Sequence, residues 1–278
     1  MKELDLLEKA ASKRVLFCGE KIIDVYKYVR PLGKTMKDPI ITVELMDTEE
    51  FEGGVIAAAE HAKDFCKSVD IYTAGPVIEK IRYVEQSHLR KLFQCYISTG
   101  SNWPMQYDYS NYDCVVVTDY GHRDGRWDTP ASKYLAINVQ TNAGNYGFNL
   151  ATKYHKCDYL VVDEAEARLA TQNRAGKIED SLAVLGEIAP KVCITLGRSG
   201  AIGACNGEFV QCSAYTESVV DTIGAGDAFF AITALIAEEA DMHSLLRIGN
   251  AAGAIKTSIV GHRRSVTKDE LIKVLRSA

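Results

Sequence analysis

The sequence lacks the cysteine and histidine arrangements that hold a structural metal. Its eight cysteines include no C-x-x-C pair, and its six histidines form neither H-x-H nor H-E-x-x-H. A structural zinc site is therefore not expected. The chain has 278 residues, which is long for a disulfide-dependent secreted domain, and no signal-peptide pattern opens it. We expect a cytoplasmic protein with reduced thiols, of which Cys18, Cys114 and Cys193 lie in apolar strand-like runs.

The sequence also lacks a long apolar run and an excess of positive charge. No apolar stretch is long enough to span a bilayer. The formal net charge of −5 argues against nucleic acid or an anionic membrane as the main partner. With 47% hydrophobic and 25% charged residues, the composition is that of an ordinary globular domain. We expect residues 1–278 to form one large α/β domain.

Two common nucleotide-binding signatures are missing as well. No G-x-x-x-x-G-K-[ST] occurs anywhere, which excludes a P-loop kinase. The pair Gly224 and Gly226 lacks the third glycine of a dinucleotide fingerprint, because Phe229 occupies that position. A nicotinamide-dependent dehydrogenase is therefore disfavoured.

The most informative stretch that is present runs from Asp221 to Asp227, with the sequence DTIGAGD. An extended segment at 217–220 precedes it, and apolar residues at 229, 232, 235 and 236 follow with helical spacing. Gly224 and Gly226 are thus predicted at the first turn of a helix, where free N–H groups and the helix dipole attract a phosphate. A carboxylate beside such an anion site suits a base that takes a proton from an attacking hydroxyl. The stretch predicts a phosphotransferase with Asp227 as its base.

This stretch resembles the C-terminal signature of the ribokinase-like, or PfkB-type, carbohydrate kinases. The resemblance implies a three-layer α/β sandwich with a mostly parallel central sheet and a small β lid. It implies that Gly224, Ala225 and Gly226 form the anion hole and that Asp227 is the general base. It also implies ATP as phosphoryl donor and Mg²⁺ as its metal.

The N-terminal third resembles the same family. A buried strand is predicted at 14–18, a β lid at about 25–50 formed by runs at 25–30 and 40–46, and a helix through 57–62. The resemblance implies that Asp24, Gly53 and Gly54 clamp the sugar hydroxyls. The family commonly has an Asn after the two glycines, and here Val55–Ala58 has none.

The middle of the chain alternates between strands and helices, as expected for a sheet covered on both faces. Strands are predicted at 69–73, 93–98, 114–118, 136–140, 158–162 and 192–195, helices at 77–90 and 178–189, and a loop at 103–112. Asp119 and Asn142 follow two of these strands. The Asp119-Tyr120-Gly121 turn is similar to one in heptose 7-phosphate kinases, which implies a substrate-site role. Asn142 could donate hydrogen bonds to a polyol, or it could satisfy its own turn.

The C-terminal half carries the residues that the resemblance assigns to the nucleotide and its metal. Asp163 and Glu166 stand where the family orders Mg²⁺, although two acids at a helix start also complement the helix dipole. The implied nucleotide contacts come from the Thr-x-Gly-x-x-Gly run, the glycine motif and the helix after it, and they are Thr195, Gly197, Gly200, Thr222 and Asn250.

The acceptor is the least determined part of the prediction. The favoured acceptor is the anomeric hydroxyl of heptose 7-phosphate, whose phosphate could be held by basic residues on the lid and after the Asp119 turn, namely Lys34, Lys37, Arg123 and Arg126. Alternatives are a nucleoside kinase, an ATP-dependent lyase, and a degenerate kinase kept as a binding protein. The apolar lid residues Val29, Ile41, Val43 and Leu45 predict a homodimer formed through the lid.

Overall fold

The computed structural model describes residues 2–100, 108–123, 125, 127, 132–215 and 219–277. Three earlier assignments fall wholly or partly outside these ranges. Arg126 is outside them, as are half of the predicted 103–112 loop and part of the extended segment before the glycine motif.

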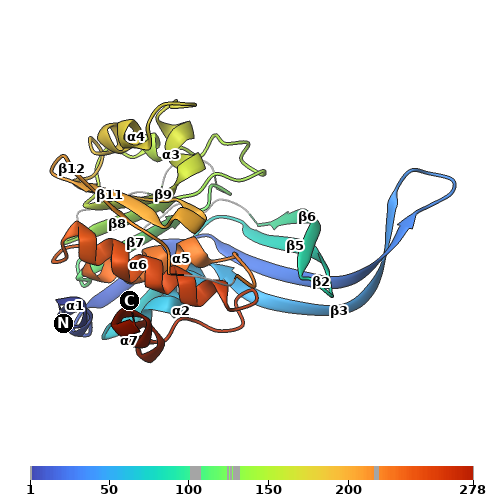
Figure 1. Cartoon of the computed structure of the whole chain (residues 1–278), viewed down its shortest axis with the longest axis horizontal. Coiled ribbons are helices and arrows are strands. Elements are labelled where there is room, and N and C mark those ends of the chain that lie inside the picture. The colour runs from blue at the N-terminus through green and yellow to red at the C-terminus, as the bar shows by residue number, and fades with distance from the viewer. Residues whose placement is uncertain are drawn as a thin grey trace.

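A main sheet runs through the body of the molecule (Figure 1). Among the described residues it has eight strands in the order β12-β11-β10-β9-β8-β7-β1-β4. Six of them are parallel: β1 Arg14–Gly19, β4 Ser68–Thr73, β7 Cys114–Asp119, β8 Leu135–Val139, β9 Tyr159–Asp163 and β10 Lys191–Thr195. An antiparallel hairpin, β11 Ala201–Cys205 and β12 Glu208–Cys212, completes one edge. The predicted, mostly parallel central sheet is confirmed.

The helices cover both faces of this sheet, because alternate strand residues point to opposite sides. One face carries α1 Lys2–Ala10, α2 Val55–Ala62, α5 Ala225–Ile236, α6 Met242–Thr257 and α7 Lys268–Ser277. The other carries α3 Glu164–Ala170 and α4 Ile178–Leu185. In β1, for example, Val15 and Phe17 pack into the first layer while Leu16 and Cys18 pack into the second. The result is a three-layer α/β sandwich.

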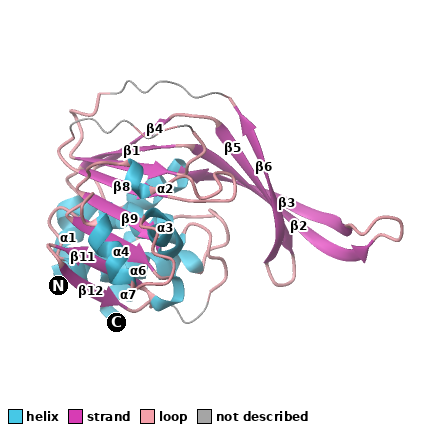
Figure 2. Cartoon of the chain, turned by 90° about the horizontal axis from the view of Figure 1, so that it is seen from above, coloured by secondary structure: helices cyan, strands magenta, loops and turns pink. Residues whose placement is uncertain are grey.

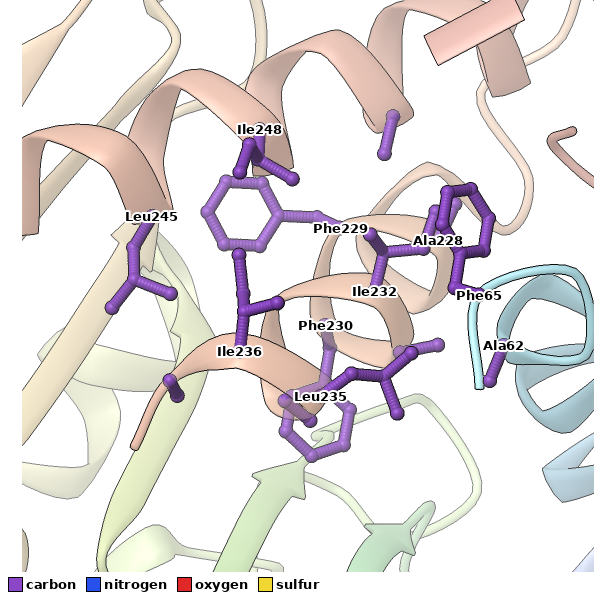
Figure 3. Close-up of a cluster of buried hydrophobic side chains, with 14 of the residues drawn as sticks. Ala62, Phe65, Ala228, Phe229, Phe230, Ile232, Leu235, Ile236, Leu245 and Ile248 are labelled. Atoms are coloured by element: carbon purple, nitrogen blue, oxygen red, sulfur yellow. The ribbon is translucent and has the colours of Figure 1, made fainter. Parts of the chain in front are cut away.

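Helix α5 lies at the centre of the larger apolar core. Figure 3 shows its side chains packed between Ala62 and Phe65 on one side and Leu245 and Ile248 of α6 on the other. Every residue of α5 from Ala228 to Ile236 is buried. The helix that begins at the glycine motif is therefore held rigidly on all sides, which fixes the position of its first turn.

A second sheet forms the lid and extends away from the body (Figures 1 and 2). Its strands, in the order β3-β2-β5-β6, are β2 Lys21–Lys34, β3 Ile41–Gly54, β5 Val77–Glu85 and β6 Arg90–Thr99. The two long strands β2 and β3 make a hairpin whose turn lies at 35–40, and β2 extends past the predicted run at 25–30. The lid is thus larger than the predicted segment at 25–50.

The predicted helix at 77–90 is wrong, because β5 occupies most of that segment. Apolar residues at 77, 78, 81 and 84 mimic helical spacing, but all four are β-branched and suit a strand. β5 is held by parallel pairing with β2 and antiparallel pairing with β6. The strand predicted at 93–98 exists, although it belongs to the lid and not to the main sheet.

Candidate active site

The glycine motif has the geometry of a helix-start anion site. Gly224 caps α5 with φ 78°, a left-handed conformation that favours glycine, and the helix begins at Ala225. A Cβ added to Gly226 would meet nothing within 4 Å, so the space above this turn is open. The first N–H groups of a helix have no acceptor within the helix. Here the Ala225 N–H donates to the Thr222 carbonyl at 3.3 Å, which leaves the N–H groups of Gly226 and Asp227 for an anion. This arrangement can receive a phosphate.

A buried lysine ammonium on α6 is hydrogen-bonded to the glycine motif. Lys256 of α6 is fully buried, and its Nζ donates to the carbonyl oxygens of Ile223 and Gly261, each at 2.7 Å. Burial lowers the pKa of Lys256. At the start of the motif, the Asp221 carboxylate accepts hydrogen bonds from Tyr26 and Lys91, which both belong to lid strands. The motif is therefore tied to α6 and to the lid.

Asp227 lies on the first turn of α5, and its carboxylate is held by two residues that the sequence analysis missed. The Tyr120 hydroxyl and the Gln140 amide each donate to Oδ1 at 3.0 Å. Tyr120 directly follows β7 and Gln140 directly follows β8. Polar residues immediately after parallel strands converge at the carboxyl edge of a sheet, and that position was the available signal.

A cavity of about 810 Å³ opens beside the glycine turn. Its lining includes every residue predicted to contact the nucleotide, namely Thr195, Gly197, Gly200, Thr222 and Asn250, together with Ala225, Gly226 and Asp163. Asn250 anchors one wall, because its Nδ2 donates to the carbonyl oxygens of Cys212 and Ser213 at 3.0 and 3.1 Å. The cavity thus brings together residues that are up to 94 positions apart in the sequence (163 to 257).

Asp163 and Glu166 form a capping box at the start of α3. Asp163 Oδ1 accepts from the Glu166 N–H at 2.7 Å, and Glu166 Oε2 accepts from the Asp163 N–H at 2.7 Å. Burial, and then the neighbouring Asp163 carboxylate, raise the pKa of Glu166 to about 8. Asp163 lines the cavity, whereas the Glu166 carboxylate is buried and accepts from the N–H groups of Asp163 and Thr141. The Asp163 carboxylate on the cavity wall suits a hard cation with its waters. Over the described ranges, no group of three or more acidic, histidine or cysteine side chains could hold a metal alone.

Asp24 is buried inside the lid and already has an arginine and a histidine as neighbours. It lies on β2, where its carboxylate is paired with Arg82 of β5 and lies 3.2 Å from His262 Nε2. Burial opposes ionisation, but the hydrogen bond from His262 and the charge of Arg82 prevail and lower the pKa of Asp24 to about 2. A Cβ at Gly53 would collide with the Asp24 carboxylate, so a glycine is needed there. Gly54 has φ 61° and ends the hairpin at α2. The sequence analysis did not identify Arg82 or His262.

Asp119 and Asn142 hold their own loops. Asp119 is fully buried, and its carboxylate accepts from the Gly121 N–H, Tyr154, Lys153 and Asn149. Asn142 donates to the Tyr120 carbonyl at 2.7 Å and accepts from the Gly144 N–H at 2.8 Å. The turn chemistry that was left open for Asn142 is therefore present. Both residues shape the loops that carry Tyr120 and Gln140.

A second cavity, of about 710 Å³, lies between the lid and the loops that follow β7 and β8. Ile78, Tyr96 and Ser98 line it from the lid, and Gly121, His122, Arg123, Asn145, Phe148 and Lys153 are among its residues on the body. The Lys80 ammonium of β5 is close by, 5.7 Å from the centroid of the Tyr96 ring and 5.8 Å from that of Tyr120. Lys34 and Lys37, in contrast, are exposed at the far end of the β2–β3 hairpin. Of the predicted phosphate-holding residues that are described, only Arg123 lines the cavity.

The comparisons with known proteins agree with this geometry. Residues 149–269 match the model of the pfkB family carbohydrate kinases. The matched segment is therefore similar to the pfkB family carbohydrate kinases. It includes the glycine motif, Asp227, the capping box and the Thr195–Gly200 run.

Two curated relatives align with part of the chain. The first is 2-dehydro-3-deoxygalactonokinase of Haloferax volcanii, 31% identical over 130 residues, which are 44% of this chain and 39% of that protein. The second is deoxyribokinase of Salmonella typhi, 28% identical over 116 residues, which are 40% of this chain and 35% of that protein. The alignments thus span well under half of these relatives.

Solved structures share the fold over almost the whole chain. Arabidopsis thaliana ribokinase, complexed with ribose and ATP, superimposes with a TM-score of 0.70 and 17% identity, covering 95% of this chain and 99% of that one. Escherichia coli phosphofructokinase-2 gives a TM-score of 0.70 and 13% identity with the same coverage. The predicted ribokinase-like fold is confirmed. Within the part of the chain that is described, no helix has the length and apolarity to cross a membrane.

Proposed function

We propose that this protein is an ATP-dependent kinase that phosphorylates a hydroxyl of a sugar or sugar phosphate, with Asp227 as its general base. The observation that carries the proposal is the position of Asp227. Its neighbour Gly226 lines the first cavity, and its partner Tyr120 precedes Gly121, which lines the second. A carboxylate between two cavities, at an open helix start, suits transfer of a group from one cavity to the other.

In this mechanism the nucleotide occupies the first cavity and directs its γ-phosphate to the N-terminus of α5. The N–H groups of Gly226 and Asp227 stabilise the negative charge of the transferring group. Asp227 accepts the proton of the acceptor hydroxyl while that oxygen bonds to phosphorus and the bond to ADP breaks. Mg²⁺, held at Asp163 and Glu166, would neutralise phosphate charge when bound.

The favoured acceptor is a phosphorylated sugar, and heptose 7-phosphate with its anomeric hydroxyl is the specific candidate. Two cationic side chains of the lid favour an acceptor that carries a negative charge. They are Lys80 and Arg82, which lie two residues apart on β5 and are both buried on the face toward the site. Arg82 is matched by Asp24, whereas Lys80 lies against two aromatic rings. In this proposal Asp24, Gly53 and Gly54 still define the acceptor side, with Asp24 acting together with Arg82.

The experiment is a turnover assay of the purified chain with ATP, Mg²⁺ and matched acceptors, each sugar with and without its phosphate. We expect ADP release with at least one phosphorylated sugar. Asp227→Asn should lower kcat by on the order of 10²-fold or more while ATP and sugar binding stay nearly unchanged. Activity of Asp227→Asn within a few-fold of wild type would remove Asp227 from the mechanism. Turnover with nucleosides alone would favour a nucleoside kinase, and nucleotide binding without any turnover would favour a degenerate binding protein.

We further propose that the protein works in the cytoplasm, where ATP and Mg²⁺ are supplied. All eight cysteines are free thiols, as suits a reducing compartment. The proposed assembly is a homodimer formed through the lid.

A further inference from the structure

The Asp227 carboxylate is held in an unsymmetrical way. Both hydrogen bonds that it accepts from described side chains end on the same oxygen: Oδ1 lies 3.0 Å from the Tyr120 hydroxyl and 3.0 Å from Gln140 Nε2. Oδ2 accepts neither of these bonds. The two oxygens of the proposed base therefore have different environments before any substrate arrives.

The Tyr120 side of this arrangement is rigid. Its side chain is 3% exposed, its N–H donates to Glu20 Oε2 at 3.1 Å, and its carbonyl accepts from Asn142. Glu20 is itself fully buried and accepts a second backbone N–H, from His122 at 3.1 Å. The Tyr120 hydroxyl therefore has little freedom to follow Asp227 if the carboxylate turns.

The Gln140 side is equally constrained. Its N–H donates to the Asp119 carbonyl at 2.8 Å, and its own carbonyl accepts from Asn149 Nδ2 at 3.0 Å. Its side-chain amide donates to Asn138 Oδ1 at 3.2 Å as well as to Asp227. Because Asn138 of β8 holds the Gln140 amide in place, this amide is also a fixed hydrogen-bond donor to Asp227 Oδ1.

We propose that Tyr120 and Gln140 are positioning residues that fix the rotamer of Asp227 and reserve Oδ2 for the acceptor's proton. This inference rests on the proposed kinase function. Two donors from two different strands hold one oxygen, so the carboxylate plane cannot rotate without losing both bonds. The free oxygen is then presented in one orientation, which lowers the entropy cost of reaching the reactive geometry. Neither residue exchanges a proton with the substrate.

The test uses Tyr120→Phe and Gln140→Leu, singly and together, each with and without Asp227→Asn. We expect kcat to fall roughly 10-fold for each single variant, with the KM values for ATP and acceptor nearly unchanged. In the Asp227→Asn background the same substitutions should have little further effect, because no base remains to be positioned. Tyr112→Phe is the matched control, since the Tyr112 hydroxyl donates to the Asp70 carboxylate at 2.8 Å away from the site. Its kcat should equal that of wild type.

A crystal structure of the double variant gives a readout that does not depend on activity. We expect the Asp227 side chain to occupy more than one rotamer. Full kcat in both single variants, while Asp227→Asn is inactive, would overturn the positioning role and leave the kinase function standing. Equal losses in the presence and absence of Asp227 would also overturn it, because they would indicate a structural effect. An active Asp227→Asn would instead overturn the kinase mechanism.

Discussion

Gly224 and Gly226 stand two residues apart in the motif but serve different needs. Gly224 requires its left-handed φ of 78°, and a Cβ there would lie 2.8 Å from His262 Cε1. Gly226 is within helix α5, and a Cβ there meets open space. Gly224 is therefore needed for its backbone conformation. Gly226 is proposed to be needed because a side chain there would block the phosphate.

This difference predicts that an alanine at position 226 increases stability but decreases activity. Gly226→Ala should raise the free energy of unfolding by about 0.5–1 kcal/mol, because alanine suits a helix better than glycine. It should nevertheless lower kcat at least several-fold, because the new methyl group enters the space proposed for the phosphate. Gly224→Ala is the contrasting variant and should destabilise the fold by about 1–2 kcal/mol. Unfolding curves and turnover of the two variants check this, and unchanged turnover of Gly226→Ala would count against a phosphate at this turn.

Asp24 is predicted to bind the sugar, and its pairing with Arg82 indicates that it also stabilises the fold. Asp24→Ala should raise the sugar KM by roughly 10-fold or more, from loss of a charge-assisted contact, and leave the KM for ATP nearly unchanged. It should also lower the melting temperature, because Arg82 would remain buried without its carboxylate.

Two further variants separate these effects. Asp24→Asn keeps the shape and much of the hydrogen bonding, so it should be the more stable of the two. Glu44→Ala breaks a carboxylate–arginine pair with Arg30 on the exposed part of the lid, so it should leave both KM values unchanged. A rise in the KM for ATP alone would remove Asp24 from the acceptor site.

At the scale of elements, the contact between α5 and α6 is close-packed around one glycine. A Cβ at Gly249 of α6 would lie 2.6 Å from Cδ2 and Cζ of the Phe229 ring of α5. Gly253, one turn later, would place its Cβ 3.6 Å from the Ala225 carbonyl, an ordinary contact. The same substitution on the same helix should therefore have opposite effects.

Gly249→Ala should destabilise the protein by about 1–3 kcal/mol, because the Phe229 ring would have to move within a packed core. Gly253→Ala should stabilise it by up to about 1 kcal/mol through helix propensity. Denaturant unfolding without nucleotide measures both. A stable Gly249→Ala would mean that the two helices can move apart, and that α5 is less rigidly held than its burial against α6 indicates.

At the scale of the whole molecule, the lid presents apolar surface that the described chain does not cover. Ile41 is 67% exposed and Leu45 is 56% exposed on β3, and Phe93 and Ile97 of β6 are also exposed. Val29, which was expected to share this surface, is instead fully buried, and Val43 is half-buried. The surface proposed for a second chain is therefore the outer part of β3 at Ile41 and Leu45.

We expect a homodimer at micromolar concentration, because such edge strands are otherwise prone to unspecific pairing. Ile41→Glu with Leu45→Glu should convert it to a monomer in analytical ultracentrifugation. Phe209→Glu on β12, where the native side chain is 46% exposed, is the matched control and should leave the mass unchanged. A wild-type monomer at high concentration, or a dimer that survives both lid charges, would rule out this assembly.

The sequence alone determined the features that depend on neighbouring residues. The DTIGAGD stretch contains the glycine for a positive φ, the open helix start and the acid of its first turn, so its local chemistry could be predicted. The six parallel strands of the main sheet were predicted for a similar reason, since continuous apolar runs such as Cys114–Thr118 indicate burial on both faces. The antiparallel hairpin of β11 and β12 was not predicted.

The tertiary structure decided what depends on distant segments. The segment 77–85 has apolar spacing that suits a helix or a strand, and only its pairing with β2 makes it part of the lid. Tyr120 and Gln140 reach Asp227 across 107 and 87 residues of sequence, and Arg82 reaches Asp24 across 58. No local pattern encodes such partners, because they meet only when the carboxyl ends of separate strands are brought to one edge and the lid folds over them.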